Sequence, residues 1–506
     1  MQNNNKKKGE IAFNSILEEI TNTASSFDAI PHKEVLKALL ETLHYIDFKA
    51  LANADGEETL TKVEPVEVKG ETVESIKAKN KKVKKNNYHV LIIDELLKVA
   101  RANHWNFCEI NHSIYLYNGA FWKQITEKGI KHFLGKAAIK MGMRRLDAKH
   151  FSFKDNLLRQ FLTDAVLEVT EVPENTVLIN LQNGTFEITP ERRDLRSFNA
   201  KDFLIYQLSF PYDENAKAPK FHRYLKEVLP DEDCRKILAE YLGYVFTRNL
   251  KLEKILLLYG SGANGKSVFF EIVNAILGKE NVTNYALQSL TNESGYQRAR
   301  LGDALVNYAS EINGNLNFAI FKQLASGEPI GVRLPYSKPF VLRNYAKLIF
   351  NCNELPKKVE QTDAFFRRFL IIPFNVTIKE DKRDKNLAKN IIESELSGVF
   401  NWVLEGLDRL LENQGFTESK LVKKQLEEYR KESDSVQLFL DEYDCKKSIS
   451  HSMSVKQAYM LYKTFCQDFT YKLESKINLK KRLIQLGYDV KRDKTGNVVY
   501  LEMKGN

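Results

Sequence analysis

Residues 255–277 constrain the fold more than any other stretch of the chain. They read ILLLYGSGANGKSVFFEIVNAIL, an apolar run that breaks into a glycine-rich turn and resumes with helical spacing. The turn fits the pattern GxxxxGK[ST] between a predicted strand and a predicted helix, which is the context in which such loops cradle phosphate. The glycines let successive backbone N–H groups face phosphate oxygens, and the start of the helix adds partial positive charge.

The predicted ligands of this loop are ATP and Mg²⁺. Lys266 is expected to reach the β and γ phosphates, and the Ser267 hydroxyl is expected to bind Mg²⁺. An idle glycine turn is the alternative, which the flanking strand and helix disfavour. The full set of predicted nucleotide-binding residues is Gly260, Ser261, Gly262, Ala263, Asn264, Gly265, Lys266, Ser267 and Val268.

Hydrolysis of a bound triphosphate needs further groups around the phosphates. The apolar run at 304–312 predicts a strand ending at Glu311, whose carboxylate would polarise water and support the metal. Alternatively, Glu311 is a surface acid after a strand. The run at 346–356 predicts another strand, ending at Asn353, whose amide can hydrogen-bond both water and the γ phosphate.

A cation is also required to stabilise the transition state of phosphoryl transfer. The segment DAFFRRFLIIPF places Arg367 and Arg368 between aromatic and apolar residues. Either is a candidate arginine finger, and an ordinary surface arginine pair is the alternative.

Composition limits the class of protein and its partners. The 506 residues are too many for one core, and no apolar run approaches the roughly 20 residues of a membrane-spanning helix. The start of the chain lacks the pattern of a secretory signal, so we expect a cytoplasmic protein that does not enter a membrane. Five scattered cysteines disfavour a disulfide framework or a zinc site, and the net charge of +10 favours polyanionic partners.

The pattern along the chain predicts an α/β protein of several parts. Hairpins are expected around the turns Asn118–Gly119 and Asn183–Gly184, and Gly243 is a possible interruption of a helix. The expected parts are a helical segment at 1–61, a charged linker at 62–87, an α+β module at 88–215, a helical collar at 216–250, an ATPase domain at 251–375, a helical segment at 376–432 and a winged-helix DNA-binding domain at 433–506.

The order of these motifs resembles superfamily 3 helicases, P-loop NTPases of AAA+-like fold. The phosphate loop, a strand ending in Ser-Glu, the segment IFKQLASGEPIGVRLPYSKPF, a strand ending in Asn and then Asp-x3-Arg-Arg follow within about 110 residues. The chain is most similar to the phage and plasmid primase-helicase family, which includes the poxvirus primase-helicase. The likeness covers about residues 170–506.

The resemblance implies roles for residues and a mode of assembly. It implies Walker A at Gly260–Ser267, a Walker B strand ending at Glu311, a sensor at Asn353 and an arginine finger at Arg367 or Arg368. It also implies a hexameric ring with ATP between subunits and the finger supplied by the neighbour. Where some relatives have paired acids, this chain has Ser310-Glu311, which puts a second metal carboxylate in doubt.

The family also places a helix and a DNA-gripping hairpin between Walker B and the sensor. They correspond to 318–326 and about 332–342, with Lys338 at the expected tip. Lys322 and Arg333 are further candidate DNA contacts. All three are predicted to be electrostatic contacts without base readout, and ordinary solvent exposure is the alternative for Lys338.

The C-terminal pattern of a helix, a basic helix and a hairpin is the outline of a winged helix. The DNA-binding candidates there are Lys476, Lys480, Lys481, Lys491 and Arg492. Packing of this solvated face against the ring is the alternative. Residues 1–170 show no paired-aspartate strand motif and no His/Cys metal set, so primer synthesis is not expected.

The function predicted from the sequence is an ATP-dependent DNA helicase for replication of a phage, plasmid or other mobile element. The expected partners are single-stranded and forked DNA, other copies of the chain, and a separate primase or replication protein. The first alternative is an initiator or scaffold that uses ATP to assemble on DNA without unwinding. The second is a small-molecule phosphotransferase, which the basic C-terminal outline disfavours.

Overall fold

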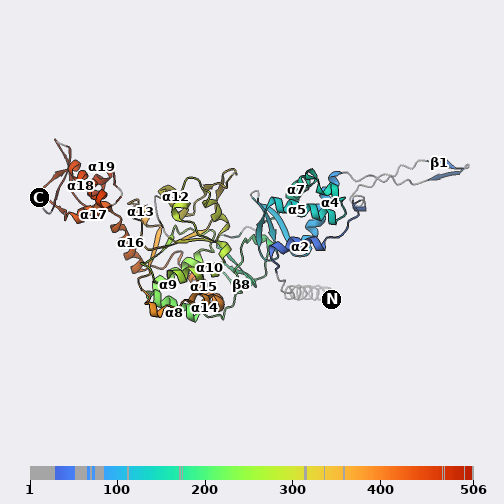
Figure 1. The fold of residues 1–506 in the computed structure, drawn as a ribbon, viewed down its shortest axis with the longest axis horizontal. Helices are drawn as coiled ribbons and strands as arrows, with labels where there is room; N and C mark the ends of the chain where they lie inside the picture. Colours follow the sequence, from blue (N-terminus) through green and yellow to red (C-terminus); the bar gives the residue numbers. More distant parts are fainter. Residues whose placement is uncertain are drawn as a thin grey trace, which may run out of the picture. The chain divides into compact units, whose positions relative to one another are not determined.

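The computed structural model describes residues 29–48, 50–51, 65–68, 71–74, 85–110, 113–169, 172–173, 175–310, 312, 316–335, 337–356, 359–469, 471, 473–494 and 496–503. The chain divides into two compact units, residues 1–173 with 195–207 and residues 174–194 with 208–506 (Figure 1). Within the described parts, none of the helices combines the length and the apolar character that a membrane crossing requires.

The first unit packs helices against a small antiparallel sheet, as predicted for an α+β module. The sheet has the order β3-β4-β5, and the predicted turn at Asn118–Gly119 lies between β4 and β5. Phe107 of β3 packs against Phe133 and Phe161 of two helices in the core. The elements are α2 (His32–Thr42), β1 (Pro65–Val68), β2 (Glu71–Glu74), α4 (Lys85–Ala102), β3 (Asn106–Ile110), β4 (Ser113–Tyr117), β5 (Trp122–Ile125), α5 (Glu127–Lys140), α6 (Arg145–Lys149), α7 (Phe151–Asp164) and η1 (Ala200–Asp202).

The start of the chain differs in detail from the prediction. Strands β1 and β2 pair antiparallel within the segment predicted to be a linker, and α4 begins at Lys85 rather than after residue 87. Of the predicted helical segment at 1–61, the described part forms α2, and residues 1–28 and 52–61 lie outside the described residues.

The second predicted hairpin is formed by β6 (Val177–Leu181) and β7 (Gly184–Ile188), and β8 (Arg193–Arg196) completes a sheet of three strands. Leu181 pairs directly with Gly184. The turn therefore consists of Gln182 and Asn183, and the predicted position at Asn183–Gly184 is wrong by one residue.

The second unit is built on a parallel sheet of five strands in the order β10-β11-β14-β9-β15. The four residues 255–258 of β9 are fully buried, which explains why its sequence is continuously apolar rather than alternating. In Figure 1, α9, α10 and α15 lie on one side of this sheet and α12 on the other. This arrangement confirms a mixed α/β class with a parallel sheet.

The remaining elements of the second unit follow in chain order. They are α8 (Pro219–Val228), α9 (Glu232–Tyr244), β9 (Ile255–Tyr259), α10 (Lys266–Leu277), η2 (Lys279–Asn281), β10 (Val282–Thr283), α11 (Leu287–Leu290), η3 (Arg298–Asp303), β11 (Val306–Ser310), α12 (Phe318–Ser326), β12 (Ile330–Val332), β13 (Phe340–Leu342), β14 (Lys347–Cys352), α13 (Asp363–Phe366), β15 (Phe369–Pro373), η4 (Glu380–Lys382), α14 (Leu387–Ser394), α15 (Leu396–Asn413) and α16 (Lys420–Glu432).

The C-terminal part has the predicted succession of helix, helix, basic helix and hairpin. Its elements are α17 (Ser435–Glu442), β16 (Lys446–Lys447), β17 (Met453–Ser454), α18 (Val455–Asp468), α19 (Lys476–Gln485), β18 (Val490–Asp493), β19 (Gly496–Val499) and β20 (Leu501–Glu502). The hairpin β18–β19 joins β17 in a sheet of three strands. Phe439, Tyr462, Leu479 and Val499 share one buried core, so the helices and the hairpin pack together.

Helices α9 and α15 approach each other so closely that glycine is required at their contact. A Cβ atom on Gly406 would lie 2.3 Å from the carbonyl carbon of Ala239, and one on Gly243 would lie 2.6 Å from Cβ of Leu407. Helix α9 includes Gly243 but ends one residue later, at Tyr244. The possible interruption predicted at Gly243 therefore lies within one residue of the observed helix end, and the glycine also serves helix packing.

We expect Gly406→Val to lower the stability of the second unit. The added side chain meets backbone atoms that cannot rotate away, so the helices must separate, and overpacking of this kind costs about 1–3 kcal/mol. Thermal unfolding followed by circular dichroism would show a lower midpoint. Gly415→Val is the matched control, because the nearest atom to its Cβ is 3.8 Å away; equal midpoints for the two variants would contradict the packing argument.

Candidate phosphate-binding site

The loop between β9 and α10 spans residues 260–265 and is shaped by its glycines. Gly265 has a φ of 87°, in the region that favours glycine, and it immediately precedes α10. A Cβ atom on Gly260 would lie 2.5 Å from the carbonyl oxygen of Phe374. The loop therefore needs glycine at both positions, one for its backbone angle and one for its close approach to the end of β15.

Lys266 is folded back over this loop. Its Nζ atom donates to the carbonyl oxygen of Gly260 at 2.6 Å and to Oδ1 of Asn264 at 2.9 Å. The Asn264 amide in turn donates to the carbonyl oxygen of Phe374 at 2.9 Å. Burial lowers the pKa of Lys266 below the usual value for lysine. Both acceptors of the ammonium group are neutral, so a phosphate would compete for it strongly.

The ends of two neighbouring strands lie beside the loop. Strand β11 ends at Ser310, which pairs in register with Asn351 of β14, and Asn353 follows the end of β14. These three residues and residues 262–268 line one cavity of about 760 Å³. The structure thus brings Asn353 to the loop, as the strand assignment predicted. Glu311 lies outside the described residues, and its role as the water-polarising carboxylate stays a prediction.

The second wall of the cavity was not identified from the sequence. The Tyr224 hydroxyl donates to the carbonyl oxygen of Gly265 at 2.8 Å, and the Ile378 amide donates to the carbonyl oxygen of Ala263 at 2.8 Å. Burial raises the pKa of Tyr224 far above its usual value, so its hydroxyl remains protonated as a donor. The wall residues are Lys220, Arg223, Tyr224 and Glu227 from α8 and Ile378, Lys382, Arg383, Asp384, Leu387 and Asn390 from the segment after β15.

The metal prediction rests on Ser267 together with Glu311. The Ser267 side chain is exposed and lines the cavity next to Lys266. Within the described residues, no cluster of three or more His, Cys, Asp or Glu side chains suits a metal ion. One hydroxyl beside a phosphate site fits Mg²⁺, because this ion keeps several waters and is bound largely through substrate phosphates.

The two arginines of the predicted finger differ in their surroundings. The Arg367 side chain is 61% exposed, and its Nη2 lies 3.0 Å from Oε2 of Glu253. The Arg368 side chain is only 8% exposed; it donates to Oγ of Ser326 at 2.9 Å and to the carbonyl oxygen of Ala364, and it also pairs with Glu253. Neither arginine lines the cavity of the phosphate loop.

The predicted helix and hairpin between the two strand ends are present. Helix α12 covers the predicted 318–326, and β12 and β13 pair antiparallel on either side of an exposed connection that contains Lys338. The guanidinium of Arg333 lies 5.0 Å from the ring centroid of Tyr296. Lys322 is held in an ion pair with Glu360 at 2.8 Å. Of the three candidate DNA contacts, Lys338 is therefore the one without a partner within the described residues.

The C-terminal candidates also divide into paired and unpaired side chains. Lys480 donates to Oδ1 of Asn497 at 2.9 Å, and Lys491 pairs with Asp489 at 2.8 Å, both close to the hairpin. The exposed candidates that make no hydrogen bond or ion pair within the described residues are Lys476, Lys481 and Arg492.

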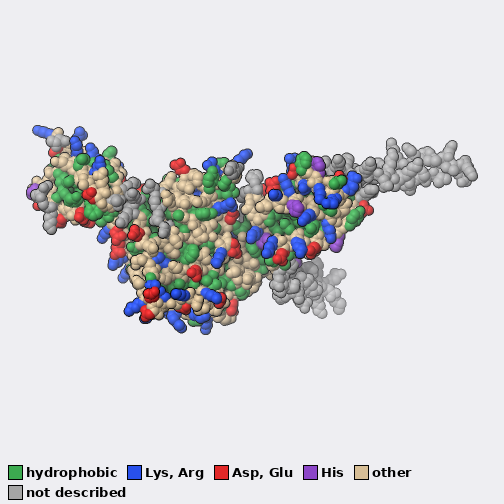
Figure 2. Space-filling view, in the orientation of Figure 1, with side chains coloured by type: hydrophobic (Ala, Val, Ile, Leu, Met, Phe, Trp, Pro, Cys, Tyr) green, Lys and Arg blue, Asp and Glu red, His purple; other side chains and the backbone are tan. Residues whose placement is uncertain are grey.

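The positive charge of the protein is not confined to one of these places. Figure 2 shows lysine and arginine side chains distributed over the visible surface of both units, among aspartate and glutamate. The net charge therefore does not by itself identify a binding face. The candidate cations differ instead in their individual contacts.

Two family models match separate parts of the chain. The model described as "D5 N terminal like" matches residues 90–230, and the model described as "Family of unknown function (DUF5906)" matches residues 258–368, which contain the loop, both strand ends and the hairpin. Together these matches cover about half of the first unit and, in the parallel sheet, all of β10, β11 and β14.

Two viral proteins are similar over about half of the chain. "Putative helicase L207/L206" of Acanthamoeba polyphaga mimivirus is 26% identical over 314 residues, which are 55% of this chain and 32% of that protein. "Putative helicase 121R" of Invertebrate iridescent virus 3 is 25% identical over 256 residues, 43% of this chain and 26% of that protein. The chain thus spans about a third or less of the length of these relatives.

Among solved structures, the C-terminal region of NrS-1 in its apo form is similar, with a TM-score of 0.47 and 14% identity over 81% of this chain and 98% of that one. The family models and the viral relatives confirm the resemblance to phage and viral primase-helicases that was inferred from the motifs.

Proposed function

We propose that this chain, a relative of the viral and phage primase-helicases, is an ATP-dependent DNA helicase that serves replication. The observation that carries the proposal is the placement of Lys266, Ser310 and Asn353 around one cavity at the carboxyl edge of a parallel sheet. Ligands of α/β proteins bind at this edge, and a glycine-rich loop leading into a helix there suits the phosphates of a nucleotide. The viral relatives named as putative helicases support a helicase activity, and DNA as its substrate is part of the proposal.

We propose the following roles in the site. Lys266 exchanges its contacts with Gly260 and Asn264 for phosphate oxygens, and the N–H groups of 262–265 hold the same phosphates. Ser267 holds Mg²⁺, which neutralises phosphate charge when it is bound. Asn353 hydrogen-bonds the γ phosphate and the attacking water, and Glu311 polarises that water.

The finger is proposed to come from another subunit of a ring. Neither Arg367 nor Arg368 lines the cavity of its own chain, so either one can act as the finger only on a nucleotide bound by another subunit. Arg367 is the better candidate because its side chain is mostly exposed, whereas Arg368 is buried against Ser326. Assembly as a homo-hexamer is part of this proposal.

DNA is proposed to contact the hairpin and the C-terminal part. Lys338 lies in the connection between β12 and β13 and contacts phosphates of one strand. The helices and hairpin after residue 433 act as a winged helix on duplex DNA, through Lys476, Lys481 and Arg492. The division into seven parts, from the segment at 1–61 to the winged helix, is retained as part of this proposal.

We expect Lys266→Ala to abolish DNA-stimulated ATP hydrolysis and unwinding of a forked duplex. Loss of a single group aimed at developing charge typically lowers kcat about 10²–10³-fold. Lys279→Ala, an exposed lysine that lines neither the phosphate-loop cavity nor the hairpin, is the control. Unwinding by Lys266→Ala would refute the mechanism. Slow hydrolysis without strand displacement by the wild type would instead favour an initiator or scaffold.

We expect Arg367→Ala and Lys266→Ala proteins, each inactive alone, to regain ATP hydrolysis when mixed. If the finger acts across a subunit junction, a mixed ring contains junctions in which an intact Lys266 faces an intact Arg367, and a finger contributes about 10³–10⁵-fold. If Lys266 and Arg367 of the same chain served one nucleotide, every site in the mixture would still lack one of these two side chains. Absence of recovery would therefore contradict a finger supplied in trans by Arg367.

Arg368→Ala is the comparison for this experiment. Since Arg368 bonds Ser326 and the Ala364 carbonyl in its own chain, its loss is expected to lower the unfolding midpoint. Because the Arg368→Ala protein keeps Lys266 and Arg367, its folded molecules should hydrolyse ATP on their own. Mixing it with the Lys266→Ala protein should therefore add no activity to that of the folded fraction. Recovery with Arg368→Ala and not with Arg367→Ala would transfer the finger role to Arg368.

We expect Lys338→Ala to separate hydrolysis from unwinding. Without the ammonium group the hairpin loses its grip on the phosphate backbone, so unwinding should fall at least tenfold while hydrolysis without DNA stays within about twofold. Lys338→Arg, which keeps the charge, should unwind. Parallel loss of both activities in Lys338→Ala would remove the role assigned to the hairpin.

A further inference from the structure

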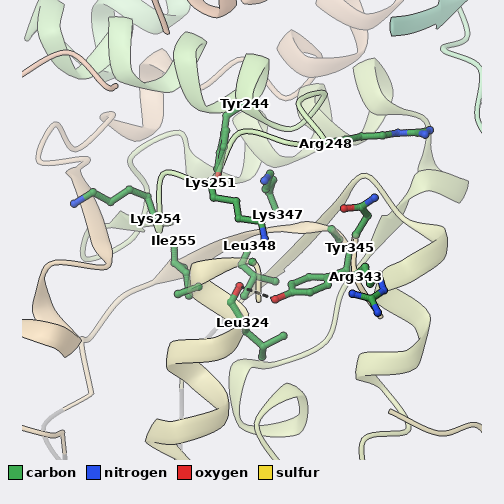
Figure 3. A pocket seen from close by; sticks show the side chains of 14 residues that line it. Tyr244, Arg248, Lys251, Lys254, Ile255, Leu324, Arg343, Tyr345, Lys347 and Leu348 are labelled. Carbon is green, nitrogen blue, oxygen red and sulfur yellow. Dashed lines mark hydrogen bonds between the residues drawn. The ribbon is translucent and has the colours of Figure 1, made fainter. Parts of the chain in front are cut away.

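A second cavity lies at the opposite edge of the parallel sheet, where β9 and β14 begin (Figure 3). We name it the amino-edge cavity. Its volume is about 30 Å³. The lining residues come from the end of α9 and the segment after it, the end of α12, and the segment that leads from β13 into β14: Tyr244, Arg248, Lys251, Lys254, Ile255, Leu324, Ala325, Gly327, Arg343, Asn344, Tyr345, Ala346, Lys347 and Leu348.

The lining is strongly basic. Five of these residues are lysine or arginine, and none of the residues that line the cavity is acidic. Arg248, Lys251 and Arg343 are exposed and make no hydrogen bond or ion pair within the described residues. The nearby carboxylate of Glu253 is already paired with Arg367 and Arg368. Glu328 is a further carboxylate close to the wall, since it raises the pKa of Tyr345, and against five cations it leaves an excess of positive charge.

Lys347 stands at the centre of this charge. Its Nζ lies 3.9 Å from the ring centroid of Tyr244 and donates to the carbonyl oxygen of Leu250 at 3.3 Å. In Figure 3, Lys251 and Lys347 reach towards the space between Tyr244 and Tyr345, while Lys254 and Arg248 extend to opposite sides. Burial and the neighbouring Lys251 lower the pKa of Lys347 to about 8. An anion in this cavity would favour the charged form of Lys347 and so oppose this shift.

The wall beside Lys347 is fixed in place. The Tyr345 hydroxyl donates to the carbonyl oxygens of Gln323 and Glu328, both at 3.0 Å, and so ties the segment after β13 to the end of α12. The cavity has room for about two water-sized groups, since each needs ~10–15 Å³. Two oxygens of one phosphate group fit this space, whereas a nucleobase does not.

We propose that the amino-edge cavity binds a phosphate group of the single-stranded DNA backbone. DNA is the favoured source because Arg343 directly follows β13 of the hairpin proposed to grip the strand, so one strand can contact both. The proposal rests on the proposed helicase function and adds a second phosphate contact at the base of the hairpin. Lys251, Arg343 and Lys347 are its binding residues.

The test compares Lys251→Ala/Arg343→Ala with Lys279→Ala/Arg300→Ala, a control that removes two exposed cations lining neither cavity. Binding of the full chain to a fluorescein-labelled oligothymidine is measured by anisotropy without ATP, over a range of salt concentrations. Each phosphate contact to a single strand contributes about 0.7 to the slope of log K against log salt. We expect the first variant to lose about this slope, with about fivefold weaker binding at 0.1 M salt, and the control to match the wild type.

A pH series adds a readout specific to Lys347. Because its pKa is lowered to about 8, the ammonium charge is present below pH 8 and is lost as the pH rises through that value. The groups facing it are Lys251 and the Tyr244 ring. Wild-type affinity for the oligonucleotide should therefore fall between pH 7 and 9, whereas Lys347→Arg should keep its affinity over this range. Equal pH dependence of the two proteins would overturn the role of Lys347.

Three outcomes would overturn the proposal in distinguishable ways. If the wild type binds DNA and the two double variants behave alike, the cavity takes no DNA phosphate while the helicase proposal stands. If the wild type binds no single strand, the proposed function itself fails. The third outcome is that inorganic phosphate, at constant ionic strength, binds the wild type and not Lys251→Ala/Arg343→Ala, while both proteins have the same salt slope for DNA binding. The cavity then takes free phosphate, and the DNA assignment is wrong.

Discussion

The hydrogen bond from Asn264 to the carbonyl oxygen of Phe374 links the loop after β9 to the end of β15, and the candidate site depends on this link. Strand β9 lies between β14 and β15, so its loop emerges in the middle of the carboxyl edge with a neighbour on each side. Gly260 approaches Phe374 so closely that a side chain at position 260 would clash with the Phe374 carbonyl oxygen. Lys266 then has two acceptors from this loop, Gly260 and Asn264, and is held where a phosphate would meet it.

Side-chain partners separate the cations of this protein into two groups. Lys322, Lys480 and Lys491 each have a partner in their own chain, so recruiting them to a phosphate would first break that contact. Exposed ion pairs are weak, about 0–1 kcal/mol, and this cost is small beside a charge-assisted bond to phosphate. Arg368 is different because its contacts are buried, and a buried charge that loses a partner is costly.

The sequence was most informative where structure is local. The strand, turn and helix inferred from residues 255–277 match β9 and α10 to within a residue, because each is encoded in consecutive residues. The bounds of α12 match those that the family resemblance implied. The error at the β6–β7 turn is one residue, since an Asn-Gly pair marks a turn without fixing which two residues lie between the paired ends.

Contacts between segments that are distant in the sequence could not be predicted from consecutive residues. Tyr224 reaches Gly265 across 41 residues, and nothing in the ordinary amphipathic pattern of α8 marks its hydroxyl as part of a site. The two arginines are adjacent in the sequence, and they differ because Arg368 is buried, where it meets Ser326 of α12 and the Ala364 carbonyl, whereas Arg367 is exposed. The packing role of Gly243 could not be predicted, because the helix that packs against it begins more than 150 residues later.

The segment before β9 contacts both the amino-edge cavity and Arg367. Lys254 lines the amino-edge cavity and also donates to the carbonyl oxygen of Arg367, while its neighbour Glu253 pairs with the Arg367 guanidinium. Coupling between two sites requires an element that both sites bias. Lys254 and Glu253 are consecutive residues, so the backbone that carries one also carries the other. Residues 253 and 254 therefore connect the amino-edge cavity to Arg367, the proposed finger, through contacts within one chain.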